Sequence, residues 1–145
     1  MAGANRNDPF GAFNFSVEID GVTTTSFSEV SGLDAEIEPI EYRTGDEDIT
    51  VRKIPGLRKY SNITLKRGFT PDLSLWNWMK QGLAGKVMRA NMSITLLDGA
   101  RQPVLRWNVR EAWPCKWEGP DLNTKGNDIA IETLEICHEG IELVE

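Results

Sequence analysis

The residues with the most obvious chemistry stand together near the carboxyl end, where a thiol, an imidazole and a carboxylate follow one another as Cys137-His138-Glu139. Such a set could supply a nucleophile and its base. Adjacent residues of a strand point to opposite faces, however, so Cys137 and His138 are not expected to share a hydrogen bond. The chain has no second histidine. We therefore predict a structural role for His138 and no enzyme activity.

A second candidate is the acidic run Asp46-Glu47-Asp48, whose carboxylates could bind calcium. A calcium loop needs spaced oxygen ligands and a closing glutamate, which this run lacks, so we interpret it as a solvated loop tip. The sequence also contains no GxGxxG, phosphate-loop, GxSxG or HExxH motif. We expect neither a metal nor a cofactor.

The remaining candidates are aromatic and thiol side chains. Five tryptophans could form a platform for a sugar or a base, but their spacing is more typical of core or interface aromatics. They are Trp76, Trp78, Trp107, Trp113 and Trp117. Cys115 and Cys137 belong to no CxxC pair, which favours buried free thiols over a redox or zinc site. Whether the two cysteines form a disulfide is left open.

Charge is sorted by position between residues 29 and 67, where eight acidic residues precede six basic ones. The acids are Glu29, Asp34, Glu36, Glu38, Glu41, Asp46, Glu47 and Asp48; the bases that follow them are Arg52, Lys53, Arg58, Lys59, Lys66 and Arg67, and Arg43 stands among the acids. One interpretation is the solvated face of an ordinary hairpin. The other is a self-complementary surface through which identical copies stack, and the scarcity of chemistry elsewhere favours this building-block hypothesis.

Length and charge limit the classes of partner. The 145 residues are interpreted as one domain, 1–145. A net charge of -6 argues against a dedicated binder of nucleic acid or anionic membranes. No segment approaches the roughly 18 apolar residues of a membrane span, so we expect folding in the cytosol without a membrane anchor.

The pattern along the chain is mainly that of strands. Residues 13–19 alternate with a period of two, Asp20-Gly21 turns the chain, and 22–30 form the predicted return strand. Residues 35–42 alternate weakly around Pro39, which suggests an edge or a bulge. An arm of two strands, 49–54 and 60–66, is predicted to turn at Pro55-Gly56.

Only one segment favours a helix. Thr70-Pro71-Asp72 resembles a helix start and Gly82 or Gly85 a helix end, so a helix is predicted over 71–84. Its apolar stripe is predicted to pack on a sheet and consists of Leu75, Trp76, Met79 and Leu83.

The carboxyl-terminal third predicts a second hairpin, 92–97 and 104–110, turned by Asp98-Gly99. A loop-rich connection from Trp113 follows. In the last strand Ile129 and Ile131 differ in phase from Leu134 and Ile136, which indicates a bulge near Glu132 or Thr133, or burial on both sides.

Several segments, in this order, resemble the tail tube proteins of contractile phage tails and contractile injection systems. They are DPFGAFNFSVEIDG, SFSEVSGL, EYRTGDED, IPGLRKYSNITLKRG, LWNWM and NDIAIETLEICHEGIEL, and they span nearly the whole chain. The resemblance implies a small antiparallel β-sandwich or barrel with one flanking helix and a long hairpin arm, carried here onto residues 43–67. It also implies six-membered rings stacked into a hollow tube inside a contractile sheath.

That resemblance suggests partners and surfaces. The partners would be other copies, the sheath protein, baseplate or hub and tail terminator proteins, and a cargo in the lumen, with assembly in the bacterial cytoplasm. The helix would lie outside the ring, with Trp76 or Trp78 facing the sheath. The predicted subunit interface consists of Arg43, Arg52, Lys53, Ile54, Leu57, Arg58, Lys59, Glu36, Glu38, Glu41, Asp46 and Asp48. Alternatives are a tube-like baseplate adaptor and a secreted hexameric ring of a type VI secretion system.

Overall fold

The computed structural model describes residues 14–42, 52–121 and 130–144, which form a mainly antiparallel β structure with one helix. The elements are β1 (Asn14–Ile19), β2 (Thr23–Phe27), β3 (Glu29–Ser31), β4 (Glu36–Tyr42), β5 (Arg52–Lys59), β6 (Ile63–Gly68), α1 (Ser74–Leu83), β7 (Ala90–Leu97), β8 (Pro103–Glu118), β9 (Ile131–Cys137) and β10 (Gly140–Val144). The predicted fold class is confirmed.

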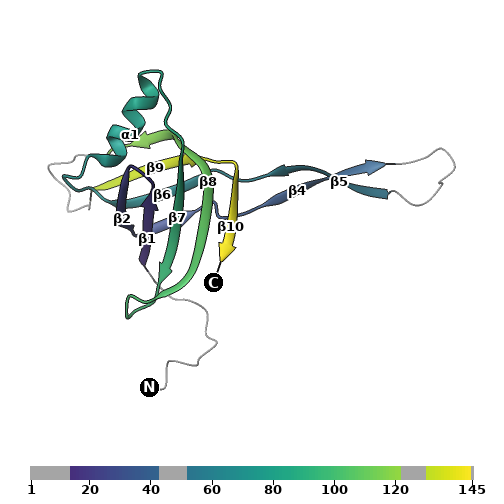
Figure 1. The fold of residues 1–145 in the computed structure, drawn as a ribbon, viewed down its shortest axis with the longest axis horizontal. Coiled ribbons are helices and arrows are strands. Elements are labelled where there is room, and N and C mark those ends of the chain that lie inside the picture. The colour runs from purple at the N-terminus through teal and green to yellow at the C-terminus, as the bar shows by residue number, and fades with distance from the viewer. Residues whose placement is uncertain (1–13, 43–51, 122–129, 145) are drawn as a thin grey trace.

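The main sheet folds over on itself into two layers because β8 is long enough to belong to both. Its strands are ordered β2-β1-β7-β8-β9-β6-β3, with β10 also paired to β8. The first part of β8 pairs with β7 and β10, and the second part pairs with β9. Figure 1 shows β1, β2, β7 and β10 running upright in front, with β9, β6 and β3 crossing behind them. We call these two groups the front layer and the back layer.

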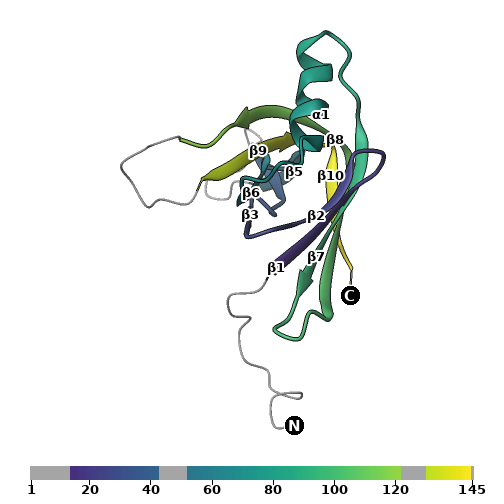
Figure 2. The ribbon, with the colours of Figure 1, turned by 90° about the vertical axis from the view of Figure 1, so that its left-hand side faces the viewer.

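The corner of β8 lies at Glu111, which has a φ of 51°. The register of β8 with β7 shifts beside this residue, between the pairs at Ala90 and Met92. A bulge of this kind bends a strand and increases its twist, so β8 can leave one layer and enter the other. Figure 2 shows the resulting curve of β7 and β8 around the body.

Both predicted tight hairpins are confirmed. Gly21 adopts a φ of 74° between β1 and β2, and the Asp98 carboxylate accepts hydrogen bonds from the Ala100 and Gln102 amides between β7 and β8. The predicted return strand 22–30, in contrast, is divided. Ser28 separates β2 from β3 and donates its amide to Lys66 O at 2.9 Å, so the chain changes layer at this residue.

The core lies between the two layers and under α1. It is built from alternate residues of the strands, as the period of two predicts. Its fully buried members include Val17, Ile19, Ile63, Leu65, Ile94, Val109, Leu134 and Ile136, with Leu75 from the helix. Burying side chains of this size stabilises the fold by about 1.5–3 kcal/mol each relative to exposure.

The helix begins later and packs differently than predicted. It starts at Ser74, because the Asp72 carboxylate accepts hydrogen bonds from the Ser74 amide at 3.0 Å and hydroxyl at 3.1 Å in a turn before the helix. The Ser74 amide is the main reason why the pKa of Asp72 lies below its usual value. The buried helix residues are Leu75 and Trp78, whereas Leu83 is exposed.

The prediction that Trp78 faces outward is wrong. Its side chain is 2% exposed, and its indole Nε1–H donates to Met88 O at 2.8 Å. A buried indole needs such an acceptor, and Met88 supplies it from the segment that follows the helix. Trp76 is the half-buried tryptophan of α1, and its ring lies 4.9 Å from that of Trp117, centroid to centroid.

Two predictions for the carboxyl-terminal strands are corrected. The stretch from Trp113 to Trp117 is not a loop, because it forms the second part of β8, with a register shift beside Cys115. The predicted bulge near Glu132 is also absent, since β9 pairs with β6 without a shift from Ile136 to Ile131. Burial on both sides fails too, because Ile131 is 47% exposed.

The pairing of β9 with β6 is regular. The apolar pattern of its sequence is interrupted because a glutamate, Glu132, occupies an inward-facing position. Glu132 is 2% exposed and accepts a hydrogen bond from Arg67 Nε at 2.7 Å and one from Trp117 Nε1 at 2.7 Å. Arg67, which the sequence placed in the exposed basic arm, is 4% exposed in the core. It also reaches Thr25 and the Asp72 carboxylate and lies over the Phe27 ring.

We predict that Glu132→Ala lowers the free energy of unfolding by about 3–5 kcal/mol, because it leaves the Arg67 charge buried without its main partner. Chemical denaturation monitored by tryptophan fluorescence measures this change. The control is Glu139→Ala, which removes an exposed pair with Arg89 of 2.9 Å and is expected to cost about 0–1 kcal/mol. Equal effects of the two substitutions would contradict a structural role for the buried pair.

Candidate functional site

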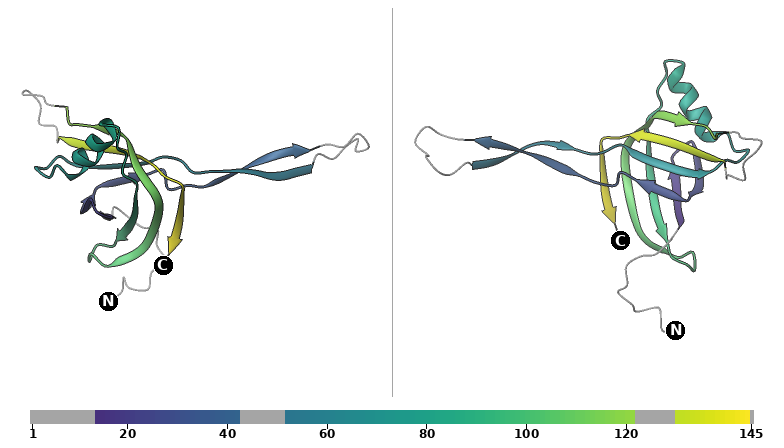
Figure 3. Two further views of the ribbon diagram at one scale, coloured as in Figure 1. Left: turned by 45° about the horizontal axis from the view of Figure 1, so that its top comes forward. Right: turned by 180° about the vertical axis from the view of Figure 1, so that it is seen from behind.

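The most unusual surface of the molecule is the arm, the two-stranded ribbon formed by β4 and β5. Figures 1 and 3 show this ribbon extending away from the body, and among the described strands β4 and β5 pair only with each other. Every residue of β4 is exposed, as is every residue of β5 except Gly56. The predicted arm, 43–67, is therefore shifted, because the ribbon spans 36–42 and 52–59 and β6 belongs to the back layer.

Prolines shape the middle of the arm. Pro39 lies opposite Pro55, and the register shifts between Ile37 and Pro39, which confirms the edge or bulge predicted at Pro39. Pro55-Gly56 is not the predicted turn, because both residues lie within β5. A Cβ at Gly56 would lie 2.6 Å from Glu38 O, so the close approach of the two strands requires glycine here.

Charged residues of the predicted interface face each other within the arm. The register places Glu36 opposite Lys59 and Glu41 opposite Lys53, and Lys59 Nζ lies 3.3 Å from Glu38 Oε2. The hairpin interpretation therefore accounts for much of the charge pattern. Arg43, Asp46, Glu47 and Asp48 lie outside the described residues, so their predicted roles are not tested.

The arm also leaves large apolar side chains exposed to water. Five large ones are exposed, with Leu57 at 72% and Ile37 at 59%. The others are Ile40, Tyr42 and Ile54. An isolated two-stranded ribbon is marginally stable in water, and exposed apolar side chains grouped in this way are typical of protein interfaces. The arm is therefore the first candidate for an interface.

The root of the arm is fastened to the body by hydrogen bonds. The Ser61 amide donates to Asp34 Oδ1 at 3.3 Å, and Ser61 O lies 2.9 Å from His138 Nε2. The Gly140 amide donates to His138 Nδ1 at 3.1 Å, so Nε2 carries the hydrogen that points to Ser61 O. His138 uses both ring nitrogens in this bridge, which agrees with the structural role predicted for it.

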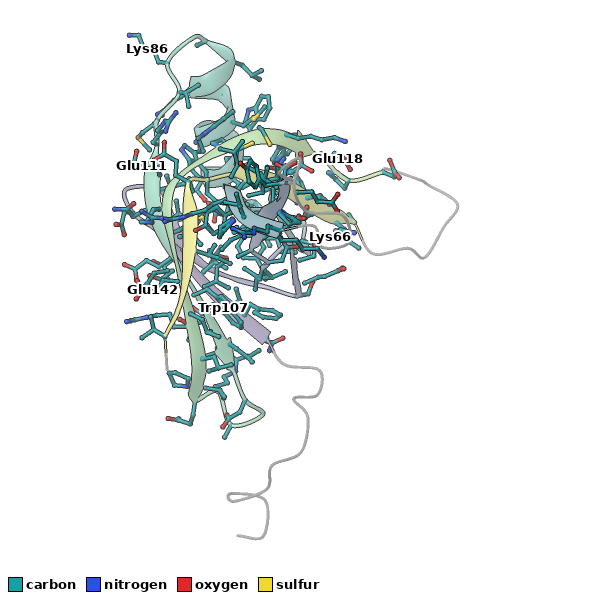
Figure 4. The ribbon with its side chains drawn as sticks, turned by 90° about the vertical axis from the view of Figure 1, so that its right-hand side faces the viewer. Lys66, Lys86, Trp107, Glu111, Glu118 and Glu142 are labelled. Carbon is teal, nitrogen blue, oxygen red and sulfur yellow. The ribbon has the colours of Figure 1, made fainter. Side chains whose placement is uncertain are left out.

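A second notable surface is the outer face of the front layer, where two rows of side chains cross five strands. One row is Ser26, Ser16, Thr95, Arg106 and Val144; the other is Thr24, Glu18, Ser93, Asn108 and Glu142. The row between them, which points inward, contains Val17, Ile94 and Trp107. Figure 4 shows Glu142 on the outer side of this layer and Trp107 on the inner side.

The outer face is polar and nearly neutral. With Arg110 it carries two bases and two acids, and hydroxyl and amide side chains occupy most other positions. None of the exposed large apolar residues of the described chain belongs to its two rows. This composition suits contact with water better than burial against another protein.

Within residues 14–42, 52–121 and 130–144, no group of three or more His, Cys, Asp or Glu side chains is arranged to hold a metal ion. The same residues include no helix with the length and apolar character needed to cross a bilayer. The surfaces that stand out are therefore the arm and the polar outer face.

Comparison with known proteins identifies the family of the chain. The sequence matches the T4-like virus tail tube protein gp19 family over residues 11–142. The chain belongs to this tail tube family. It is a tail tube protein of the kind found in contractile injection systems, and its family is one of structural proteins. Among curated protein sequences, none matches the chain.

Solved tail tube structures share the whole fold. A chain of the sheath-tube complex of an extracellular contractile injection system, PVC, is 28% identical with a TM-score of 0.82, covering 95% of this chain and 93% of that one. A chain of the anti-feeding prophage tube-terminating cap is 27% identical with a TM-score of 0.82, covering 99% of both. Hcp1 from Flavobacterium johnsoniae shares the fold at 16% identity and a TM-score of 0.58, covering 90% of this chain and 94% of that one.

Sequence reasoning missed the polar outer face, although the alternation within each strand of this tail tube protein carried the signal. Thr24, Ser16, Ser93 and Asn108 come from four strands, and only the register shows that they form adjoining rows. It also missed the root of the arm, because Ser61 and His138 are far apart in the sequence and meet only when β6 and β9 pair.

We predict that His138→Ala loosens the root of the arm, because it removes the acceptor of the Gly140 amide and the donor to Ser61 O. Hydrogen exchange of the Gly140 amide should become faster, and the protomer should lose about 1–3 kcal/mol of stability. Glu139→Gln, next in sequence and exposed, is the control. Unchanged exchange at Gly140 in the alanine variant would show that the bridge contributes nothing.

Proposed function

We propose that six copies of this chain close into a ring and that rings stack into a hollow tube, held together mainly by the arm. The observation that carries this proposal is the exposure of five large apolar side chains on a ribbon that pairs with no other described strand. In a neighbouring copy these side chains would find the apolar contact that the protomer does not offer. Their removal from water would hold the stack, since burial contributes about 25 cal/mol per Å² of apolar surface.

Charge has a smaller part in this proposal than the sequence alone suggested. Glu36, Glu38 and Glu41 already face Lys53 and Lys59 in their own arm. Exposed pairs of this kind contribute about 0–1 kcal/mol each, so they would orient the arm and choose its register rather than hold it. The roles of Arg43, Asp46 and Asp48 in the interface stay predictions.

The outer face of the front layer is the surface we assign to the lumen. A ring closes by rotation, and one surface of each copy must then face the water-filled channel. The two polar rows fit that position because they expose hydroxyl, amide and balanced charged groups. Such a lining would offer a passing cargo few apolar or electrostatic contacts to stick to.

The tube would act inside a contractile particle. Related chains come from a sheath-tube complex and a tube-terminating cap, and we propose corresponding partners here: a sheath protein, a baseplate or hub, and a terminator. Sheath contraction would drive the tube through a target envelope, and cargo would pass along the lumen without enzyme action. We expect assembly in the bacterial cytoplasm. Trp76, half-buried on α1, keeps its proposed place towards the sheath.

The other candidates differ in how they assemble. A baseplate adaptor would form a single ring, and a secreted ring protein would form free hexamers. The likeness to Hcp1 extends to the fold alone, at 16% identity. Negative-stain electron microscopy of the purified protein distinguishes the three, and hollow filaments of uniform width are the result we expect.

We predict that Leu57→Gln abolishes long tubes and leaves the protomer folded. Leu57 is 72% exposed, so a polar replacement should change protomer stability by no more than about 0.5 kcal/mol while removing an apolar contact between copies. Leu83→Gln on α1, at 65% exposure, is the matched control and should form tubes of normal length. Normal tubes from the Leu57 variant would remove this residue from the stacking contact.

We predict that Ser16→Cys places a thiol in the lumen. In assembled tubes a small biotin maleimide should label it, but streptavidin should bind only after the tubes are dissociated. Lys80→Cys on the exposed side of α1 is the control and should bind streptavidin on intact tubes. Both variants carry Cys115→Ser and Cys137→Ser to remove the native thiols. Streptavidin binding by the Ser16 variant on intact tubes would refute the lumen assignment.

A further inference from the structure

The two cysteines lie beside a shift in the pairing register of β8 and β9. Trp113 pairs with Cys137 and Pro114 with Ile136, but the next pair joins Lys116 to Glu135. Cys115 is thus the extra residue of a bulge. Because Ile136 points into the core, its neighbour Cys137 points to the opposite, outer face of the back layer.

The Cys115 side chain lies on that same face. Its Sγ is 3.4 Å from Glu135 Oε2 and 3.5 Å from Glu135 O, and Glu135 lies on the same face of β9 as Cys137, two residues away. Both thiols are free and half-buried. Cys115 and Cys137 are therefore diagonal neighbours on one face of β8 and β9, and the Cys137 thiol is close enough to raise the pKa of Cys115.

The thiol pair lies beneath the root of the arm. Asn62 Nδ2 is 3.9 Å from Cys115 Sγ, and the preceding residue, Ser61, is held by His138. His138 in turn directly follows Cys137 in the sequence. A covalent bond between the two sulfurs would therefore form beside the contacts that fasten the arm to the body.

We propose that Cys115 and Cys137 are an oxidation site. A small-molecule disulfide such as oxidised glutathione oxidises the two thiols, and the product is an intramolecular disulfide between them. The Cys137 thiolate attacks one sulfur of the small disulfide, which yields a mixed disulfide and releases one small thiol. Cys115, after losing its proton, then attacks the Cys137 sulfur and releases the second small thiol. The two protein thiols are oxidised, and one small disulfide is reduced to two thiols.

The environment of Cys115 sets the order of these steps. Burial, followed by the Cys137 hydrogen bond and the nearby Glu135, raises the pKa of Cys115 to about 12. Because the thiolate is the reactive form, Cys115 is a poor first nucleophile, and Cys137 is the thiol that opens the reaction. The pair would remain reduced in a reducing cytosol and become oxidised in a particle that leaves it.

A disulfide here would cross-link β8 to β9 and close the chain between them into a loop. Such a link stabilises the protomer chiefly by restricting its unfolded chain. In tubes it would also stiffen the root of the arm, a consequence that rests on the proposed function. The oxidation itself does not depend on tube assembly, so the test is made on the folded protomer.

The full-length chain is incubated with oxidised glutathione, treated with iodoacetamide, and analysed by mass spectrometry after digestion without reduction. We expect one peptide pair joined through Cys115 and Cys137, lighter than the two thiols by two hydrogen atoms, and a higher melting temperature. The controls are Cys115→Ser and Cys115→Ala, in which Cys137 should carry a glutathione adduct and the melting temperature should not rise.

Three results would overturn the proposal. They are a wild-type chain that carries only glutathione adducts, one that forms only intermolecular disulfides, and one that stays fully alkylated when folded but forms the disulfide in denaturant. Failure of tube assembly with an intact disulfide would instead count against the proposed function alone.

Discussion

The arm cannot bury its own apolar side chains, and the proposed assembly of the molecule depends on this constraint. A two-stranded ribbon has two faces and two edges in water, and neither β4 nor β5 pairs with any strand of the body that the structure describes. Ile37 and Leu57 are therefore left exposed by the residues that the structure describes, and we propose that a second copy covers them. The body holds the ribbon in place through the bonds at Asp34, Ser61 and His138. The protomer thus combines a body with its own apolar core and an arm whose large apolar side chains are exposed.

The body itself is organised by one long strand and one buried ion pair. β8 passes from the front layer to the back layer at Glu111, so a single sheet supplies both sides of the core. Arg67 and Glu132 join β6 to β9 inside that core, and Trp117 and Asp72 extend the network to β8 and the start of α1. A buried pair of this kind is weak evidence for stability, because the cost of removing two charges from water offsets their attraction. We interpret the network as the feature that fixes how helix and layers meet.

Local patterns in the sequence predicted the elements better than their partners. Backbone φ preferences predicted the turns at Gly21 and Asp98, and the missing amide donor of Pro39 predicted its edge character. Residue spacing predicted the helix. These predictions are confirmed. The split at Ser28, the extension of β8 through Cys115 and the inward position of Glu132 did not follow. Each depends on a residue from a distant strand, such as Lys66 O for Ser28 or Arg67 for Glu132.

The amino-acid pattern alone was enough to predict a strand-rich fold class, the tail tube family and an arm rich in charged and apolar residues. The contacts between side chains became clear from the three-dimensional fold. Trp78 is buried, whereas Trp76 is partly exposed. Arg67 lies in the core and not on the exposed basic arm, and Lys59 pairs with Glu38 within one arm. The reason is physical: periodicity fixes the side to which a residue points within its own element, whereas register and layer packing fix what lies opposite. Burial and charge pairing depend on both.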